Sequence, residues 1–387
     1  MTYAAHRRII DTDSHIIELE TFLHEAARPE HKDKIPSMLA QKDLPITQEM
    51  LDHARALFEK RQKNPESMAK FEASLLDNRK GGLTRLGAFD PAERSHTLDL
   101  LGFEMQWVLP TYTFHQIGHL EDPDALEAGA ITLNKAMAEF CSRDPRLKAT
   151  GYLPLRLGAE RSMKVLKQGF DDGCYSFMVD TNQPNDKAYS FTHPVYDPIW
   201  TEFEKRQAPV ALHVAANGDY QPVSPSFKNN GKAELEVGGD APAGELGLFT
   251  IGNSAQIFLA AMIFDGIFER HPNLTVISME HGATWLPSWL RLLDFSAGMM
   301  KRLREYSELP SETAKKHIKV SPFSGEPVGW IIANSSPDML VFASDYPHPE
   351  GGPDPIKRFE ATMENCDQAT MDAFYYGNMC AAMGLEA

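Results

Sequence analysis

Short apolar runs alternate with longer amphipathic stretches along most of this chain. Apolar residues recur at helical spacing in residues 158–173, 197–207, 254–272 and 287–306. Eight short apolar runs predict strands, and they lie at residues 7–13, 103–112, 147–155, 175–180, 209–216, 274–281, 318–323 and 339–345. Strands that alternate with helices are typical of βαβ units and a parallel sheet. Eight such units in 387 residues predict a single-domain (β/α)8 TIM barrel spanning residues 1–387.

The alternative is an open doubly wound sheet, which normally carries a glycine-rich phosphate loop after its first strand. The first strand here continues into SHIIELET, which contains no glycine. Residues from about 19 to 94 are too many for one βα unit. They predict an insertion over the carboxyl ends of the strands, where long insertions often act as lids. A stretch rich in Gly, Pro and Asn at about 217–246 predicts a loop insertion at the same face.

Composition narrows the set of partners. The formal charge of −16 argues against nucleic acid and anionic membranes, which need clustered Lys and Arg. We find no apolar run of the ~18 residues expected of a membrane span and no apolar segment typical of a secretory signal. The 4 cysteines are scattered and form no CxxC pair, so we expect reduced thiols in a cytoplasmic protein.

Polar side chains gather at the predicted strand ends. Asp13 and His15 are two residues apart on the first strand, and so share one side of it. His213 lies in the fifth strand, His281 follows Glu280 at the end of the sixth, and Asp345 ends the eighth. Each alone has an ordinary explanation: a hydrogen-bonded core histidine, a turn cap or a surface ion pair. Together they would be costly to bury without a cation, and carboxylates and neutral imidazoles are common ligands of zinc and manganese.

The ordered set of strand-end motifs resembles the amidohydrolase superfamily. The motifs are DTDSH at residues 11–15, the strand-five His, His-Gly at 281–282, SDYPHPEG at 344–351 and the closing YYGNMCAAMGL at 375–385. Within that superfamily the sequence is similar to the branch of aminocarboxymuconate-semialdehyde decarboxylase and the resorcylate and carboxyvanillate decarboxylases. The resemblance covers the whole predicted barrel, and the insertion is its least assignable part.

The resemblance implies one divalent metal ion, zinc or manganese, held by four ligands: Asp13, His15, His213 and Asp345. It assigns catalytic roles to Asp345 and to His281, which would contact substrate or transfer protons. The common first motif of the superfamily has two histidines, and Asp13 stands where the first would be. A carboxylate there makes the ligand set harder and shifts its preference from zinc toward manganese.

Two reactions fit this predicted site. The first is non-oxidative decarboxylation of an aromatic or enoic acid, and the alternative is hydrolysis of an amide, lactone, ester or carbon–carbon bond by a metal-activated water. The ligands are shared, so they do not separate the two. A third possibility, a barrel that binds without catalysis, would require a broken metal site, and none of the predicted ligand positions is broken.

The substrate contacts are the remaining expectation. By resemblance, an Arg of the insertion would bind the substrate carboxylate, and Arg79 and Arg85 are the candidates, although loop arginines are usually solvated. Tyr112, Phe114 and Trp285 lie beyond strand ends and would line a pocket for a small aromatic carboxylic acid, with core packing as the alternative. The resemblance also leads us to expect a homodimer.

Overall fold

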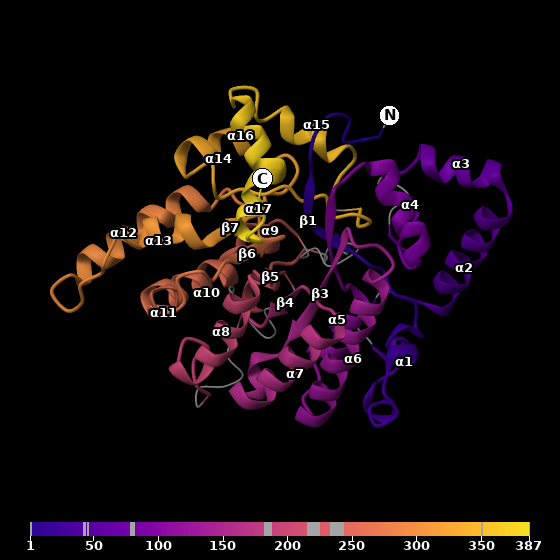
Figure 1. The fold of residues 1–387 in the computed structure, drawn as a ribbon, viewed down its shortest axis with the longest axis horizontal. Coiled ribbons are helices and arrows are strands. Elements are labelled where there is room, and N and C mark those ends of the chain that lie inside the picture. The colour runs from indigo at the N-terminus through magenta and orange to yellow at the C-terminus, as the bar shows by residue number, and fades with distance from the viewer. Residues whose placement is uncertain are drawn as a thin grey trace.

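The sheet is built from seven parallel strands that pair in chain order. The computed structural model describes residues 2–41, 44, 46–77, 82–181, 188–214, 225–232, 244–349 and 351–386. Its strands are β1 (Ile10–His15), β2 (Met105–Leu109), β3 (Leu147–Leu153), β4 (Ser176–Val179), β5 (Val210–His213), β6 (Val276–Met279) and β7 (Ile318–Val320). Each overlaps a run that the sequence predicts. The sheet is curled, with helices around it (Figure 1).

Residues 339–346 occupy the place of the predicted eighth strand. Leu340 forms a parallel bridge with Val320 of β7, and Tyr346 forms one with Ser14 of β1. The Thr12 amide of β1 also donates to the carbonyl of Phe342. This segment therefore contacts both outer strands, as the barrel requires, but it is not a regular strand. Its backbone turns into a left-handed conformation at Asp345, where φ is 55°.

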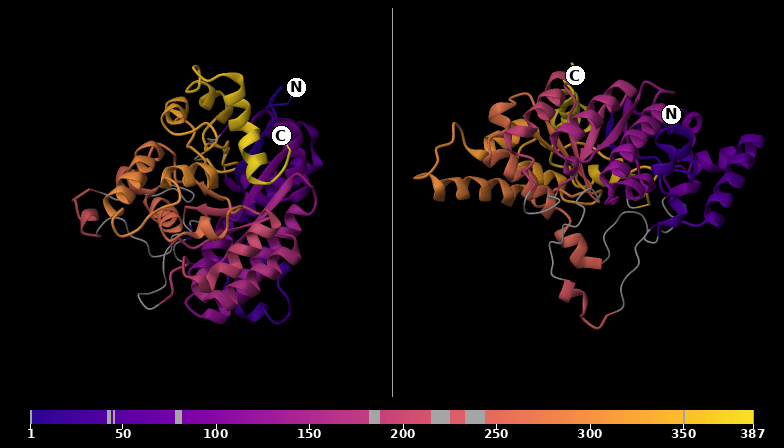
Figure 2. Two further views of the ribbon diagram at one scale, coloured as in Figure 1. Left: turned by 60° about the vertical axis from the view of Figure 1, so that its left-hand side comes forward. Right: turned by 90° about the horizontal axis from the view of Figure 1, so that it is seen from below.

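Helices connect the strands and cover the outside of the sheet (Figures 1 and 2). They are α1 (Phe22–Ala26), α2 (Gln48–Lys63), α3 (Pro65–Ala73), α4 (Pro91–Leu101), α5 (Tyr112–Gly118), α6 (Pro123–Cys141), α7 (Ala159–Asp172), α8 (Asp197–Arg206), α9 (Gly244–Thr250), α10 (Asn253–Phe264), α11 (Ile267–Arg270), α12 (Leu286–Met300), α13 (Pro310–His317), α14 (Val328–Asn334), α15 (Pro355–Glu360), α16 (Gln368–Asp372) and α17 (Asn378–Ala382). A π-helical turn, Ala373–Gly377, leads into α17.

The stretch after β1 contains α1, α2, α3 and the start of α4, and a buried ion pair ties two of these helices together. Arg61 of α2 donates from Nε and Nη2 to the two carboxylate oxygens of Glu93 of α4, each at 2.6 Å. Arg61 also donates to the carbonyl of Thr84 at 3.1 Å. The amide of Gly82 donates to the carbonyl of Pro347 at 3.0 Å. The segment that begins at Gly82 is thus held between α2 and the loop that follows the eighth strand position.

Residues 244–264 form an apolar helical stretch. The helical stretch Gly244–Phe264 is long and apolar enough to cross a membrane by length and composition alone. It comprises α9 and α10, separated by Ile251 and Gly252. Helix α10 buries Phe258, Leu259, Met262 and Ile263, which is the behaviour of a core helix. The predicted loop insertion at about 217–246 lies mostly outside the described residues.

Candidate metal centre

The carboxyl ends of three strands bring four ligand atoms into one buried cluster. Asp13 and His15 come from β1, His213 from β5 and Glu280 from the residue after β6. One atom of each lies within 4.8 Å of the others, and all four residues are buried. His15 Nε2 lies 3.2 Å from Asp13 Oδ1, and His213 Nε2 lies 3.2 Å from Glu280 Oε2. These four residues form the first group of the cluster.

Asp345 belongs to a second group that shares His15 with the first. The second group contains His15, Asp345 and His348, again with ligand atoms within 4.8 Å of one another. Asp345 Oδ1 lies 3.6 Å from His15 Nε2 and 3.2 Å from His348 Nδ1. The four predicted ligands therefore do not form one compact set by themselves. The structure brings Asp13, His15 and His213 together with Glu280 and sets Asp345 beside them.

Two of the acids reach the cluster through an unusual backbone. Glu280 and Asp345 have φ angles of 56° and 55°, in the left-handed region that residues other than glycine rarely adopt. Asp345 is held by its amide, which donates to the carbonyl of Asp13 at 2.8 Å. The amide of Glu280 donates to Ser321 Oγ at 3.4 Å. In both cases the chain turns as the strand ends.

Hydrogen bonds fix the protonation of two imidazoles. His213 Nδ1 lies 2.7 Å from the carbonyl of Val214, so Nδ1 carries a proton and Nε2 is the nitrogen that faces the cluster. The Thr111 hydroxyl donates to the carbonyl of Ile16 at 2.8 Å and lies 3.3 Å from His15 Nδ1. Since Thr111 has one proton to give, His15 donates from Nδ1 and presents Nε2.

Burial and neighbouring charge shift the pKa values of the site. Burial, followed in size by the charge of His348, lowers the pKa of His15 to about 4. Burial, followed in size by the charge of His213, lowers the pKa of His281 to about 3. Burial also acts to lower the pKa of His213, but Asp13 and Glu280 outweigh it and raise that pKa well above its usual value. Likewise, His213 and His15 outweigh burial to hold the pKa of Asp13 far below its usual value. The acids thus strongly stabilise positive charge at this point.

These residues fit a divalent cation. Asp13 Oδ1, His15 Nε2 and His213 Nε2 are buried atoms without a hydrogen bond to any residue that the structure describes. Two imidazole lone pairs face carboxylate oxygens at 3.2 Å, an arrangement that is unfavourable unless a proton or a cation lies between them. Neutral imidazole and carboxylate are ligands of zinc and manganese, and the share of carboxylates favours the harder manganese.

A buried network beneath the cluster joins β1, β2, α4 and the last strand position. Asp11 accepts from Gln106 Nε2 at 2.8 Å and from Ser344 Oγ at 2.6 Å. Gln106 accepts in turn from Arg94 Nε at 3.1 Å, and Arg94 Nη2 donates to Ser14 Oγ at 2.9 Å. Asp11 is therefore a buried hydrogen-bonding residue and not a member of the ligand cluster. It connects the strand that carries Asp13 to the residue before Asp345.

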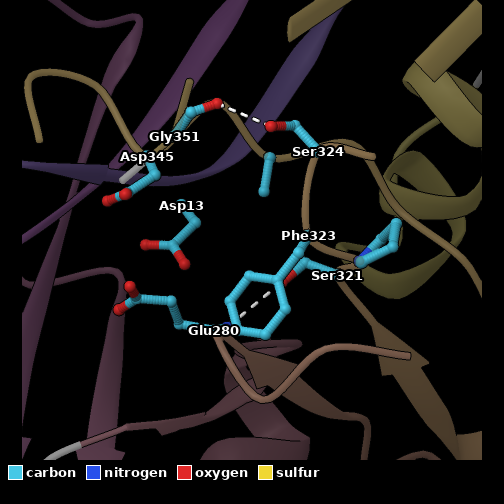
Figure 3. Close-up of a pocket in the computed structure, with 9 residues that line it drawn as sticks. Asp13, Glu280, Ser321, Phe323, Ser324, Asp345 and Gly351 are labelled. Atoms are coloured by element: carbon cyan, nitrogen blue, oxygen red, sulfur yellow. Dashed lines mark hydrogen bonds between the residues drawn. The ribbon is translucent and has the colours of Figure 1, made fainter. Parts of the chain in front are cut away.

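A small cavity opens beside the acids (Figure 3). Asp13, Glu280 and Asp345 line it together with Ser321, Pro322, Phe323, Ser324, Ala343 and Gly351. The ring of Phe323 stands next to Glu280 in this view. Ser324 Oγ donates to the carbonyl of Gly351 at 2.8 Å and closes the far side. The cavity thus combines charged ligand atoms with an aromatic wall.

The predicted substrate residues are distributed unevenly around the site. Arg85 is buried, donates from Nη1 to the carbonyl of Pro347 at 3.3 Å and lies over the ring of Tyr346. Phe114 is buried against Tyr152, and Tyr112 is partly buried against the small apolar cluster of the insertion. Trp285 donates from Nε1 to the carbonyl of Gly282 at 2.8 Å. None of these four lines the cavity beside the acids, and Arg79 lies outside the described residues.

The sequence predicts no ligand or substrate role for four residues of the site, which are Glu280, Phe323, Thr111 and His348. Strict alternation along the sixth strand would point Glu280 away from the side that carries His281. The left-handed backbone at Glu280 instead directs its carboxylate toward the cluster. Phe323 ends a predicted strand as one of several aromatic residues near the expected mouth of the barrel, and Thr111 follows β2 without a polar motif to mark it. His348 was noted in the YPHPEG stretch but not assigned as a ligand. Its ring stacks on His15 at 4.1 Å.

Comparisons with known proteins identify the family of this chain and structures of similar fold. The sequence matches the amidohydrolase family over residues 10–379, and none of the curated proteins that were compared matches it. An amidohydrolase from Mycobacterium avium subsp. paratuberculosis has a similar structure, with a TM-score of 0.73, 19% identity and coverage of 98% of this chain and 100% of that one.

Two solved decarboxylases are also similar in fold. The 5-carboxyvanillate decarboxylase of Sphingomonas paucimobilis has a TM-score of 0.63 at 14% identity, covering 98% of this chain and 99% of its own. That of Novosphingobium aromaticivorans, complexed with manganese and 4-hydroxy-3-methoxy-5-nitrobenzoic acid, has a TM-score of 0.64 at 18% identity, with coverage of 98% and 97%. With the family matched over nearly the whole sequence and a buried cluster of acids and imidazoles at the strand ends, this chain belongs to the amidohydrolase family.

Proposed function

We propose that this chain is a metal-dependent, non-oxidative decarboxylase of an aromatic carboxylic acid. The observation that carries the proposal is the cavity in which Phe323 stands beside the carboxylates of Asp13, Glu280 and Asp345. An apolar ring next to a charged centre suits a planar substrate with a carboxylate at one end. The similarity in fold to aromatic acid decarboxylases supports the same reading.

The proposed metal ligands are Asp13, His15, His213 and Glu280, with Asp345 beside them. A divalent ion held there would supply Lewis-acid binding of the substrate carboxylate and a neighbouring oxygen. Manganese is the proposed ion, because the site offers more than one carboxylate. Arg85 does not line the cavity, so its proposed contact with the substrate carboxylate would require a movement of the loop that contains Pro347.

The proposed proton donor is Asp345. In the reaction, the ring carbon that bears the carboxylate takes a proton from the Asp345 carboxyl group. The bond to the carboxylate then breaks, its electron pair remains with the ring, and carbon dioxide leaves. Asp345 regains its proton from solvent. His281 is neutral because of its lowered pKa, and its buried Nε2, which makes no hydrogen bond to a described residue, suits it to orient a substrate oxygen.

Hydrolysis is the second candidate. The same placement of Asp345 at the cavity wall would let it accept a proton from a water molecule, with His281 beside the developing oxyanion. The metal-loaded protein should therefore be incubated with a panel of hydroxybenzoates and with a panel of amides and lactones. Release of carbon dioxide from a hydroxybenzoate, abolished by chelation, is the expected result. Release of a new acid from the second panel without carbon dioxide would replace decarboxylation with hydrolysis.

Metal content provides a separate check. The two groups of the cluster share His15 and lie together, so we expect about one tightly bound divalent ion per chain. Elemental analysis after gel filtration measures it. Two tightly bound ions per chain would instead point to a binuclear hydrolytic site.

A further inference from the structure

The carboxylate of Glu326 joins two loops at the cavity beside the acids. The first loop follows β6 and contains Ala283 and Thr284, and the second follows β7 and contains Phe323. Glu326 Oε2 accepts from the amide of Phe323 at 2.7 Å and from the amide of Ala283 at 2.9 Å. Glu326 Oε1 accepts from the hydroxyl of Thr284 and from its amide, the latter at 2.8 Å. These partners are all donors, and they come from both loops.

The backbone of Phe323 is held on both sides by the same residue. Its amide donates to the Glu326 carboxylate, and its carbonyl accepts from the Glu326 amide at 3.1 Å. The Phe323 ring lies against the first loop at Gly282, where φ is 64°. A Cβ atom at position 282 would lie 3.0 Å from Cδ2 of Phe323, which is closer than an ordinary van der Waals contact. Glycine therefore lets the ring approach the loop that begins with Glu280 and His281.

The two loops carry two unlike walls of the cavity. Glu280 belongs to the charged wall and Phe323 forms the aromatic wall, and their side chains stand next to each other in Figure 3. The amide of Glu280 donates to Ser321 Oγ at 3.4 Å, a bond that does not involve Glu326. The place of the aromatic wall thus depends on Glu326 more directly than the place of the charged wall does.

We propose that Glu326 is a positioning residue that holds the aromatic wall in place, so that the cavity binds a planar aromatic acid in preference to an acid with a saturated ring. This inference rests on the proposed function and narrows its substrate class. A flat ring can stack on Phe323 or meet its edge, and a contact of this kind corresponds to a preference of about 3- to 10-fold. A saturated ring is puckered and has no π-face to offer.

Two matched acids test the proposal without turnover. Salicylate and hexahydrosalicylate carry the same carboxylate and hydroxyl groups and differ only in the saturation of the ring. Isothermal titration of the full, manganese-loaded chain measures both dissociation constants. The wild-type chain is expected to bind salicylate about 3- to 10-fold more tightly. A wild-type chain that binds the two acids equally, or binds neither, would overturn the proposal.

Variants of the two residues then identify the cause of the preference. Glu326→Ala is expected to abolish the preference for salicylate and to leave the manganese affinity unchanged, as measured by competition with a fluorescent chelator. Phe323→Leu should abolish the preference as well, and adding Glu326→Ala to it should have no further effect, because both changes act on one wall. A preference that survives in Glu326→Ala would overturn the proposal.

Asp294→Asn is the matched control. Asp294 accepts from the amide of Ser311 at 2.9 Å and from its hydroxyl at 2.7 Å, much as Glu326 accepts from Thr284. Asp294 is not among the residues that line the cavity beside the acids. This variant should therefore keep the wild-type preference, and a preference lost equally in Asp294→Asn would show a general effect on the fold and overturn the proposal.

Two further arms keep the test decisive. If Glu326→Ala does not fold, Glu326→Gln is measured instead. Its amide group keeps the length of the side chain but turns a donor toward the donors of one loop in either orientation, so the preference should fall at least about 2-fold; an unchanged preference would overturn the proposal. Release of carbon dioxide from hydroxybenzoates is measured separately. A preference that depends on Glu326 without such release would refute the proposed decarboxylation and leave the role of Glu326 standing, and release with an unchanged preference in the variants would do the reverse.

Discussion

His15 and His348 stack with their ring centres 4.1 Å apart and their planes 16° from parallel. Thr111 Oγ1 lies 3.3 Å from Nδ1 of the first ring and 2.9 Å from Nε2 of the second. A single hydroxyl, itself donating to the carbonyl of Ile16, therefore orients both rings. It fixes which nitrogen of His15 faces Asp13 and Asp345.

We expect Thr111→Val to weaken metal binding about 10- to 100-fold, because outer hydrogen bonds that fix a ligand tautomer have effects of this size. Thr111→Ser keeps the hydroxyl and serves as the control, with metal affinity close to that of the wild type. Competition with a fluorescent chelator measures both. Equal affinities in Thr111→Val and Thr111→Ser would show that the hydroxyl has no such role.

Asp345→Asn and Glu280→Gln should separate turnover from metal binding. Asparagine tolerates the left-handed backbone at position 345, so we expect Asp345→Asn to fold. Its kcat should be about 100- to 10,000-fold lower, as expected for loss of a proton-transfer group. Glu280→Gln should lower metal affinity about 10- to 100-fold, with part of the activity restored by added metal. Steady-state kinetics with and without excess manganese distinguish the two. Near-wild-type turnover by Asp345→Asn would refute the assigned proton donor.

The ion pair between Arg61 and Glu93 should be essential for the stability of the insertion after β1. Both side chains are almost completely buried, so Arg61→Met leaves a buried carboxylate uncompensated, which typically lowers the free energy of unfolding by about 3–5 kcal/mol. Arg61→Met combined with Glu93→Leu removes both charges and should recover part of that loss. Urea unfolding followed by circular dichroism measures it. Arg55→Met, which removes a more exposed pair with Glu20, is the control and should change stability by less than about 1 kcal/mol.

Asp180 should make stability depend on pH. Burial raises its pKa to about 6 from 3.8, although the Tyr152 hydroxyl, at 2.7 Å, acts to lower it. The folded form therefore keeps its proton to higher pH than the unfolded form, so this group lowers stability as pH rises from about 4 to 6 and by a constant amount above that. Asp180→Asn removes the effect. Its free energy of unfolding relative to the wild type should rise by about 2–3 kcal/mol between pH 4 and pH 7.

Tyr152→Phe tests the same carboxyl group of Asp180 by raising its pKa further. It removes a hydrogen bond that lowers the pKa of Asp180, so the loss of stability should extend to higher pH than in the wild type. Denaturant unfolding at several pH values measures all three proteins. A pH profile in Asp180→Asn parallel to that of the wild type would contradict the assignment.

The sequence predicts the strands well because each is a short apolar run between helical stretches. Helix ends were predicted less well. The predicted helix at 287–306 ends at Met300, and the predicted helix at 254–272 divides into α10 and α11 at Gly266, where φ is 72°. A glycine in that conformation ends a helix, and the apolar spacing alone does not reveal it.

The site was predictable where alternation along a strand holds. Asp13 and His15 share one side of β1, and His213 lies in the middle of an apolar run, so their meeting follows from the strand order. Asp345 is predicted from its strand-end motif, but its exact place beside the other acids, like the approach of Glu280, depends on a backbone turn, and Phe323 depends on the path of a loop. Those features are set by tertiary packing and have no counterpart in the spacing of residues.

The left-handed backbone at Glu280 and Asp345 has a consequence for how the molecule can be stabilised. Each such conformation in a non-glycine residue carries strain of about 1–3 kcal/mol, and glycine would relieve it. Replacing either acid with glycine would relieve that strain but would also remove a carboxylate from the buried cluster of acids and imidazoles. The two positions therefore hold a locally strained backbone in exchange for carboxylates that the site requires.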